Sequence, residues 1–309
     1  MNHIEFKPSF VERYSKLTDW EKFKDYSTRF LRRSIRINTI KSNEQLIKER
    51  LADWTLTQVP WCKEGFWVEH KGGRRDIGNT IEHQIGYYYV QEAASMIPPV
   101  VLDPKPGELI LDMCAAPGSK TSQIAQYMQN KGLLVANDYQ YIRLQPLGIN
   151  LQRMGITNSI LTLGEGRFFK RVDMQFDRIL VDAPCSGTGT IRKSLKTLEI
   201  YNTGAIRRLA GQQRQLIDAA FTILKPGGTL VYSTCSVEPH EDEAVIDFLL
   251  KEHSDANVEA INLNINRSEP ITDFEGEQYS DEVKKCMRIW PQDNDTEGFF
   301  IAKIIKSDE

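Results

Sequence analysis

The first part of the chain, up to about residue 85, consists of short segments of mixed type. Apolar positions recur with a helical period in some segments and alternate with polar positions in others. Thr18 and Glu21 fit a capping box, in which Thr18 caps a helix. The pattern predicts helices over 9–30 (in two pieces) and 43–54, and strands over 34–40, 56–60 and 66–69. We therefore expect a small α+β domain over residues 1–85.

From residue 86 onward, strand-like and helix-like segments alternate regularly. This rhythm is typical of a mostly parallel twisted sheet with helices on both faces. The pattern predicts helices over 91–101, 119–129, 141–154, 205–224 and 241–252, and strands over 108–113, 133–137, 159–163, 177–181, 229–233, 257–262 and 298–305. The expected fold class is α/β, with a Rossmann-like domain over residues 86–309.

Two of the predicted strands lead into a cysteine. The apolar run 176–181 is followed by Asp182 and Cys185, and the run 228–232 is followed by Cys235. A lone cysteine at a strand end is often a small buried hydrophobe. Here, however, both cysteines have hydroxyl and glycine neighbours, which do not suit a core position. Five widely spaced cysteines with no CxxC pair argue against disulfides and against a zinc site, so no metal is expected. The remaining interpretation is that one or both of these cysteines are reactive thiols.

The first strand–helix turn of the second domain has the features of a ligand site. Strand 108–113 runs into small residues and a glycine, and a helix follows, whose first N–H groups are free to bind a ligand. Neither a dinucleotide fingerprint nor a P-loop is present. Asp138 follows the second strand at the place of an acid that binds ribose hydroxyls, and Glu165 follows the third strand. These features fit a nucleoside-bearing ligand without a pyrophosphate, such as S-adenosylmethionine.

Charge is unevenly distributed along the chain. The net charge is −3, which argues against a general polyanion binder. Between residues 26 and 43 there is no acid, and five bases occur: Arg29, Arg32, Arg33, Arg36 and Lys41. Taken alone, this segment is more simply a solvated basic face than a nucleic-acid site. Residues 1–6 lack the apolar core of a signal peptide, and no segment is long enough to span a membrane, so we expect a cytoplasmic protein.

With these residues identified, the chain resembles the RNA cytosine-C5 methyltransferases of the Sun-protein family. The resemblance runs from about residue 36 to 306. It is carried by several motifs in order, each weak alone: Arg36-Ile37-Asn38-Thr39, Gln91-Glu92-Ala93-Ala94-Ser95, Asp112-Met113-Cys114-Ala115-Ala116-Pro117-Gly118-Ser119-Lys120-Thr121, Asn137-Asp138, Asp182-Ala183-Pro184-Cys185-Ser186-Gly187-Thr188-Gly189, Tyr232-Ser233-Thr234-Cys235-Ser236 and Glu297-Gly298-Phe299-Phe300.

The resemblance implies a role for each of these segments. Cys235 would be the nucleophile and Cys185 the group that assists release of the product. The N-terminal domain would be RNA-recognition-like, and the compact chain is most similar to archaeal transfer-RNA enzymes. The cofactor would be S-adenosylmethionine, held by Cys114, Ala115, Ala116, Pro117, Gly118, Ser119, Lys120, Asp138, Arg143, Glu165 and Asp182. The chain departs from the family pattern at Glu165, where Asp is usual, at residues 240–243, and at Gln292.

The chemistry of this reaction explains the two thiols. C5 of cytosine is a poor nucleophile, and a thiolate that adds at C6 places electron density on C5. Asp182 would then hold the N3/N4 edge of the base, and Lys120 would favour a nearby thiolate. The target base must be flipped or unpaired, which gives the basic segment a partner in RNA phosphates. Arg36 is the exception to consider, because it lies in the predicted strand 34–40 and could instead hold the interface between the domains.

Other functions remain open from the sequence. The same chemistry on ribosomal RNA is one alternative, although we favour tRNA. A methyltransferase for proteins or small molecules is less well supported, because residues 182–185 replace the usual amino-methyltransferase motif. A catalytically inactive RNA-binding scaffold is disfavoured by the presence of Cys185, Cys235 and Asp182. We expect a monomer that acts on RNA and does not bind membranes.

Overall fold

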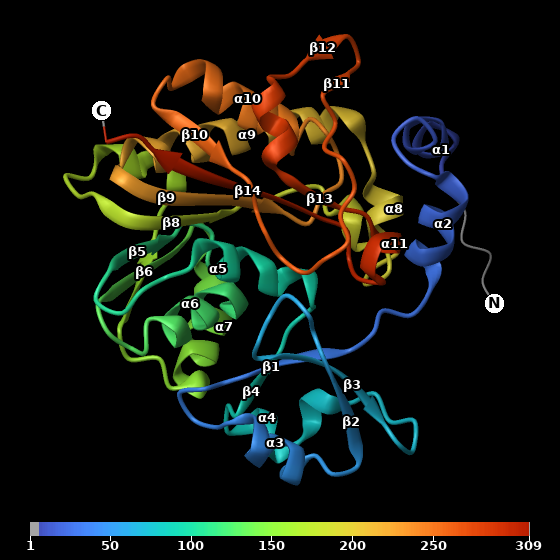
Figure 1. Cartoon of the computed structure of the whole chain (residues 1–309), viewed down its shortest axis with the longest axis vertical. Coiled ribbons are helices and arrows are strands. Elements are labelled where there is room, and N and C mark those ends of the chain that lie inside the picture. Colours follow the sequence, from blue (N-terminus) through green and yellow to red (C-terminus); the bar gives the residue numbers. More distant parts are fainter. Residues whose placement is uncertain (1–5, 309) are drawn as a thin grey trace.

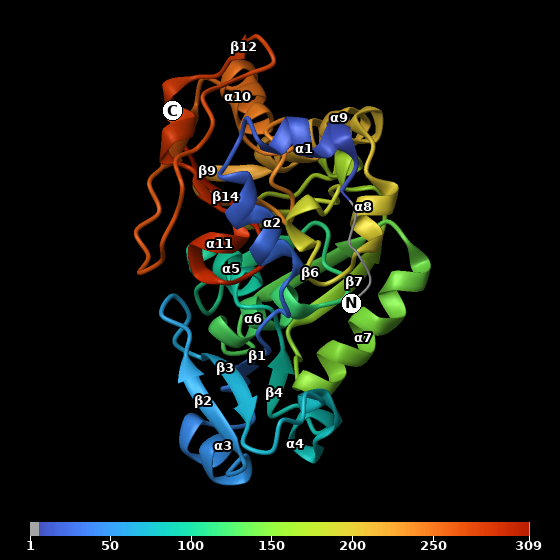
Figure 2. The same cartoon turned by 90° about the vertical axis from the view of Figure 1, so that its right-hand side faces the viewer.

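The computed structural model describes residues 6–308, which form a small sheet, a large sheet and a two-stranded hairpin of β11 Asp273–Phe274 and β12 Glu277–Gln278 (Figure 1). Residues 1–5, which hold most of the segment that lacks a signal-peptide core, lie outside the described range. A small antiparallel sheet lies at one end of the molecule, and a large mostly parallel sheet forms the other part (Figure 2). In the described range, no helix is long and apolar enough to cross a membrane.

The large sheet has the strand order β10-β14-β9-β8-β5-β6-β7, and β13 pairs with β14. Strands β5, β6, β7, β8 and β9 run parallel to one another. β14 is antiparallel to β9. The strands are β5 Leu109–Asp112, β6 Leu133–Asp138, β7 Ser159–Leu163, β8 Phe176–Asp182, β9 Leu224–Thr234, β10 Ala256–Glu259, β13 Met287–Ile289 and β14 Phe299–Lys306. The predicted Rossmann-like α/β architecture is therefore confirmed.

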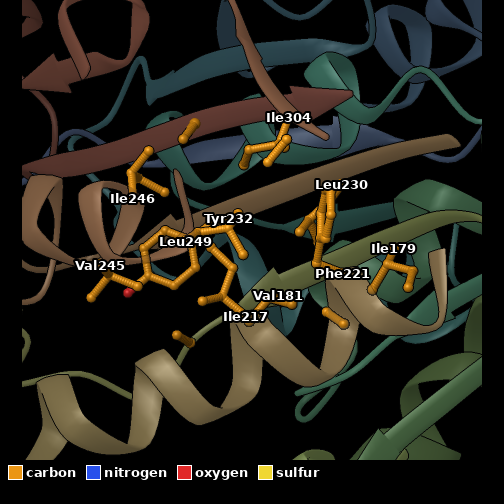
Figure 3. Close-up of a cluster of buried hydrophobic side chains, with 14 of the residues drawn as sticks. Ile179, Val181, Ile217, Phe221, Leu230, Tyr232, Val245, Ile246, Leu249 and Ile304 are labelled. Atoms are coloured by element: carbon orange, nitrogen blue, oxygen red, sulfur yellow. The ribbon is translucent and has the colours of Figure 1, made fainter. Parts of the chain in front are cut away.

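Helices cover both faces of this sheet, as the rhythm of the sequence predicts. Alternate residues of β8 and β9 enter opposite clusters: Ile179 and Leu230 pack under α9 and α10, whereas Leu180 and Val231 pack under α5 and α6. Figure 3 shows the first of these clusters, in which Phe221 of α9 is fully buried. Burial of each such side chain contributes about 1.5–3 kcal/mol. The helices are α5 Ile97–Leu102, α6 Ser119–Tyr127, α7 Tyr141–Met154, α8 Lys196–Ile200, α9 Thr203–Thr222, α10 Glu243–Glu252 and α11 Pro291–Asn294.

The small sheet has the order β2-β3-β1-β4 and is antiparallel throughout. Its fourth strand lies beyond residue 85 and was not expected from the sequence. In the same region, the helix expected over 91–101 is a 3₁₀ turn at Ala94–Met96 followed by α5. The elements of this part are β1 Ser34–Ile37, α3 Glu44–Arg50, β2 Trp54–Gln58, β3 Gly65–His70, α4 Ile81–Gln84 and β4 Tyr88–Val90.

The N-terminal helices α1 (Pro8–Tyr14) and α2 (Trp20–Thr28) lie against the large domain rather than on the small sheet (Figure 1). Their aromatic side chains form a cluster with large-domain residues that include Tyr201, Val237 and Trp290. The predicted Thr18 cap is wrong. The side chain of Asp19 accepts the N–H of Lys22 and caps α2, whereas the Thr18 hydroxyl accepts a hydrogen bond of 2.9 Å from Gln292.

Candidate active site

The two strand-end cysteines meet at one edge of the large sheet. β8 and β9 are parallel neighbours, and Asp182 at the end of β8 is in register with Ser233 of β9. The loops that follow bring Cys185 and Cys235 together, with their Sγ atoms 3.4 Å apart, although 50 residues separate them in the chain. Both are free thiols. The expectation that two cysteines lie at adjacent strand ends is confirmed.

The two thiols differ in their environments. Cys185 is half-buried and shares a hydrogen bond with Cys235, and this bond together with desolvation raises the pKa of Cys185 well above its ordinary value. The negative charge of Glu241 acts in the same direction. Cys185 is therefore protonated at neutral pH, and the two sulfurs share one hydrogen bond in which either can be the donor. The role of Cys235 as the nucleophile stays a prediction from the family resemblance.

Lys120 and Asp182 form an ion pair beside the cysteines. Lys120 Nζ lies 2.7 Å from Asp182 Oδ2, and the Ser233 hydroxyl donates to Asp182 Oδ1 at 2.8 Å. Burial disfavours the ammonium form of Lys120, but the charges of Asp182 and Cys235 outweigh burial and raise the pKa of Lys120. Lys120 is thus a permanent cation close to both Asp182 and Cys235, as expected for a group that favours a thiolate.

A cavity of about 430 Å³ opens at this edge of the sheet. It is lined by residues of the first strand–helix turn, by both members of the Lys120–Asp182 pair and by Cys235. Of the residues expected to bind the cofactor, the cavity is lined by Cys114, Ala115, Ala116, Pro117, Ser119, Lys120, Arg143 and Asp182. The structure therefore places most of the expected cofactor residues and the expected nucleophile around one space.

The turn before α6 needs a glycine for its own backbone conformation and for its packing against α7. Gly118 precedes the helix with φ of +103°, and a Cβ at this position would lie 2.9 Å from Leu147 Cδ1. Asp112 at the end of β5 also lines the cavity. Its Oδ2 accepts the Thr121 hydroxyl, whereas Oδ1 is buried with no hydrogen-bond partner in residues 6–308. Burial raises the pKa of Asp112 to about 7.

Asp138 and Arg143 lie together at the end of β6 and the start of α7. The buried Asp138 accepts the N–H of Gln140 through Oδ1, and its Oδ2 lies 3.3 Å from Arg143 Nη1. Arg143 also donates to the carbonyl oxygen of Ala116 at 2.6 Å. Within the described chain, Asp138 Oδ2 makes this ion pair but no hydrogen bond. Asp138 does not line the cavity, so its role in binding ribose hydroxyls stays a prediction.

Glu165 does not occupy the expected position. Its side chain is half exposed, and it forms an ion pair of 2.7 Å with Arg167 instead of lining the cavity. The third strand, β7, is the edge strand of the sheet, so the residue that follows it faces solvent. In this structure, Glu165 is not part of the cavity wall.

The five bases of the segment 26–43 do not form one exposed surface. Arg36 is completely buried and donates hydrogen bonds to Gln91 Oε1 at 3.0 Å, Ser119 O at 2.9 Å and Ser122 Oγ at 2.8 Å. The assignment of Arg36 to an RNA-binding face is therefore wrong, because its position in β1 turns it toward α6. Lys41 donates to the carbonyl oxygens of Ile85 and Arg153.

Lys41 is nevertheless exposed, and the other three bases of the segment also reach the surface. Arg29 pairs with Asp25 on its own helix, and Arg32 pairs with Asp295 at 3.0 Å while its guanidinium lies over Trp67. Arg33 is exposed. Arg33 is thus the residue of the segment that best fits the predicted RNA contact.

Sequence reasoning gave no role to a pair of acids in the cavity wall. Glu92 and Glu297 both line the cavity, and Glu92 Oε1 accepts the N–H of Glu297 at 3.3 Å. Burial and the neighbouring Glu297 raise the pKa of Glu92 to about 8. Both acids belong to motifs that carry the resemblance, so the sequence did indicate that each is important. It gave no indication that they lie together, because 205 residues separate them.

Comparison with known proteins now decides the family. Residues 99–305 match the family described as 16S rRNA methyltransferase RsmB/F, and residues 6–93 match the N-terminal domain of 16S rRNA methyltransferase RsmF. The chain belongs to this family. A relative named tRNA (cytosine(49)-C(5))-methyltransferase, from Pyrococcus abyssi, is 51% identical over 298 residues, which cover 96% of the chain and 95% of the relative.

Bacterial RsmB/F relatives are longer than this chain. Ribosomal RNA small subunit methyltransferase F from Shewanella piezotolerans is 43% identical over 293 residues, which cover 93% of the chain but only 60% of the relative. Among solved structures, a methyltransferase homolog from Pyrococcus horikoshii matches with 36% identity and a TM-score of 0.84, over 97% of the chain and 99% of that protein. NSun6 from the same organism, solved with SFG, has the same fold with 24% identity and a TM-score of 0.84, over 99% of the chain and 100% of that protein.

The RsmB/F family consists of S-adenosylmethionine-dependent methyltransferases, and the residues of the cavity fit this cofactor. Residues 114–117 and 119 of the turn and Arg143 line the cavity, and so does Asp112, whose buried Oδ1 has no hydrogen-bond partner within residues 6–308. An unpaired buried acceptor is costly unless a ligand satisfies it. These are the residues that would hold the cofactor, and Asp138 contacts this wall through Arg143.

Proposed function

We propose that the chain methylates C5 of cytosine in RNA, with tRNA as its substrate. The observation that carries this proposal is the pair of thiols 3.4 Å apart, beside the Lys120–Asp182 ion pair and the cavity. Methylation of a nitrogen or oxygen needs no nucleophilic thiol, whereas methylation of cytosine C5 needs one to activate the ring. The arrangement supports covalent catalysis on a pyrimidine.

In the first step, the Cys235 thiolate adds to C6 of the cytosine. A new S–C6 bond forms, and the electron pair of the C5–C6 double bond moves toward C5 and the N3 side of the ring. Asp182 lies at the same strand end and is positioned to hold the N3/N4 edge of the base. Lys120 stabilises both Asp182 and the Cys235 thiolate by its positive charge. S-adenosylmethionine, when bound, supplies the methyl group that C5 accepts.

In the second step, C5 loses its proton and Cys235 leaves. Cys185 first gives its own proton to solvent water, and its thiolate then accepts the C5 proton. The electron pair of that C–H bond restores the C5–C6 double bond, and the S–C6 bond breaks to return the Cys235 thiolate. The hydrogen bond with Cys235 is the largest cause that keeps Cys185 protonated in the free protein. Once the Cys235 sulfur is bonded to C6, it no longer carries the charge that holds this proton. Cys185 then ionises more easily, at the stage at which a base is needed.

We infer that RNA approaches over the surface between the small domain and the cavity. Phe30 is 80% exposed, and the guanidinium of Arg75 lies 4.1 Å from the centre of its ring. Arg192 donates to the carbonyl oxygen of Phe30 at 2.8 Å, and the next residue, Lys193, lines the cavity. An exposed aromatic ring among cations suits an unpaired base and its phosphates. Arg33 adds a further exposed cation to this surface.

The relatives support tRNA over ribosomal RNA as the substrate. The Pyrococcus abyssi relative matches over almost its whole length, whereas the chain spans about 60% of the length of the bacterial ribosomal relatives. Methylation of ribosomal RNA stays the second candidate, because the matching family is described by 16S rRNA.

Incubation with tritiated S-adenosylmethionine and either bulk tRNA or purified 16S rRNA tests both candidates. We expect labelled 5-methylcytidine from tRNA after nuclease digestion and nucleoside chromatography, and no label with the Cys235→Ala variant. Label in 16S rRNA alone would replace the tRNA assignment. Label in a different nucleoside, or none with either RNA, would contradict cytosine-C5 chemistry.

A further inference from the structure

The carboxylate of Glu241 joins the two cysteine-bearing loops. Glu241 is fully buried just before α10 and accepts four hydrogen bonds. Its Oε1 accepts the Ser186 N–H at 2.9 Å and the Gln213 side-chain amide at 3.0 Å. Its Oε2 accepts the Ser236 hydroxyl at 2.6 Å and the Ser186 hydroxyl. A buried carboxylate with this many donors holds each of them firmly, because hydrogen bonds to a charged acceptor are stronger than those between neutral groups.

The two serines follow the two cysteines directly in sequence. Ser186 follows Cys185, and Ser236 follows Cys235. Their hydroxyl oxygens are 3.2 Å apart, and both donate to the same oxygen of Glu241. The distance between the loops at the serines is therefore set by one carboxylate. Because each cysteine is covalently next to its serine, the same carboxylate sets the distance between the thiols.

The two loops do not depend equally on Glu241. Cys235 follows the last residue of β9, Thr234, which is paired with Phe300 of β14, and its own carbonyl oxygen accepts the Gly189 N–H at 3.0 Å. Cys185 lies in an irregular loop beyond the end of β8, and Ser186 uses both its N–H and its hydroxyl on Glu241. Loss of the carboxylate should therefore move Cys185 more than Cys235.

We propose that Glu241 is a positioning residue that holds the Cys185 sulfur where, as a thiolate, it can accept the C5 proton. This inference rests on the proposed function and adds a group to it that does not touch the substrate. Loss of Glu241 leaves attack by Cys235 possible and slows release of the product. A purely structural role would instead weaken the fold and affect both steps alike.

The test compares Glu241→Gln and Glu241→Ala with a matched control, Glu238→Gln. Glu238 is equally buried three residues earlier, but its carboxylate accepts hydrogen bonds from Tyr14 at 2.7 Å and Arg13 at 2.8 Å on α1, away from the cysteine loops. Each variant is incubated with tRNA and S-adenosylmethionine, and the RNA-linked protein is quantified on a denaturing gel. Melting temperature and cofactor affinity are measured for each variant in parallel.

We expect both Glu241 variants to accumulate an RNA-linked band, with Ala showing more than Gln, and Glu238→Gln to show none. Proton transfer by a positioned group is worth about 10²–10⁴ in rate, so partial misplacement of Cys185 should slow release by about ten-fold or more. If Glu241→Gln does not fold, Glu241→Asp keeps the charge but retracts it by one methylene, and the same band is expected.

Two results overturn the proposal and are distinguishable. An RNA-linked band from Cys185→Ala but none from any folded Glu241 variant rules out the positioning role and leaves the proposed function intact. No band from Cys185→Ala itself removes the release role of Cys185, and the role of Glu241 falls with it. The double variant Cys185→Ala/Glu241→Gln adds a check, because a residue that acts through Cys185 should slow release no further than Cys185→Ala alone.

Discussion

The Arg36 guanidinium in β1 donates a hydrogen bond of 2.9 Å to the carbonyl oxygen of Ser119, the first residue of α6. These residues are 83 positions apart, and they attach the small sheet to the helix that borders the cavity. Arg36 is completely buried and also bonds Gln91 and Ser122. The small domain is thus joined to the cofactor site by an arginine that the charge pattern alone assigns to the surface.

Arg36→Ala should lower the free energy of unfolding by about 3 kcal/mol, since it removes three hydrogen bonds from a charged donor and leaves their buried acceptors unpaired. Chemical denaturation measures this decrease. Arg33→Ala is the matched control, because Arg33 is exposed in the same segment and its removal should change stability by less than about 0.5 kcal/mol. Equal stability of the two variants would contradict the buried contact.

Arg33 and Arg75 should contribute to RNA affinity by binding phosphates. Their double alanine variant should reduce the slope of log affinity against log salt by roughly 0.7–0.9 for each phosphate that is no longer neutralised. Fluorescence titrations of tRNA at several salt concentrations measure this slope. Arg74→Ala is the control, since Arg74 is next to Arg75 but pairs with Asp76 at 3.0 Å. An unchanged slope in the double variant would show that neither arginine binds RNA phosphates and that both are simply exposed to solvent.

Asp138→Ala should weaken S-adenosylmethionine binding at least ten-fold without unfolding the protein. The substitution removes a buried charged acceptor, and a hydrogen bond to a charged group is worth about 1.5–3 kcal/mol. Isothermal titration calorimetry gives the dissociation constant. Glu165→Ala should leave that constant nearly unchanged, because Glu165 is exposed and paired with Arg167. A larger effect from Glu165 than from Asp138 would reverse these assignments.

Asp112 should make stability depend on pH near neutrality. Its pKa is raised to about 7 by burial, above the ordinary value of 3.8. Between these values the native protein binds more protons than the unfolded chain, so the free energy of unfolding falls as pH rises and levels off above about 7. Asp112→Asn lacks this titration. From pH 5.5 to 8, the stability of the parent protein relative to that of the variant should fall by about 1–2 kcal/mol in denaturant unfolding. A constant difference would show that Asp112 does not titrate in this range.

The sequence predicts the sheet well because its strands and helices are long and strongly periodic. β8 and β9 are apolar runs ended by turn residues, and their parallel pairing brings Asp182, Cys185 and Cys235 to one edge. The turn 114–120 follows the same rule, because its small residues and glycine fit the start of a helix. In these cases the local pattern and the tertiary contact agree.

The predictions that failed concern contacts between distant segments, which a local sequence pattern does not reveal. Alternation places Arg36 on the opposite face of β1 from Ile35 and Ile37, and only the position of α6 shows that this second face is also buried. Glu165 follows a strand, but that strand is at the edge of the sheet. Glu92 and Glu297 meet across 205 residues. Each depends on packing between segments that are distant in sequence.

The two cysteines should be separable by their covalent adducts with RNA. If Cys235 adds to C6, Cys235→Ala should bind RNA without any adduct. If Cys185 accepts the C5 proton, Cys185→Ala should still attack and accept the methyl group, and then remain bonded to the RNA through the Cys235 sulfur. A nuclease-sensitive shifted band on a denaturing gel reports this adduct.

The double variant identifies the order of the two steps. Like Cys235→Ala, the double variant should form no adduct with RNA, because Cys185 can assist release only after Cys235 has attacked. The raised pKa of Cys185 supports this order, since a protonated Cys185 is a poor nucleophile. A shifted band from Cys235→Ala with none from Cys185→Ala would reverse the two roles. Such a reversal is compatible with the geometry, because the two sulfurs lie only 3.4 Å apart. A band from neither single variant would leave the thiol pair without a covalent function.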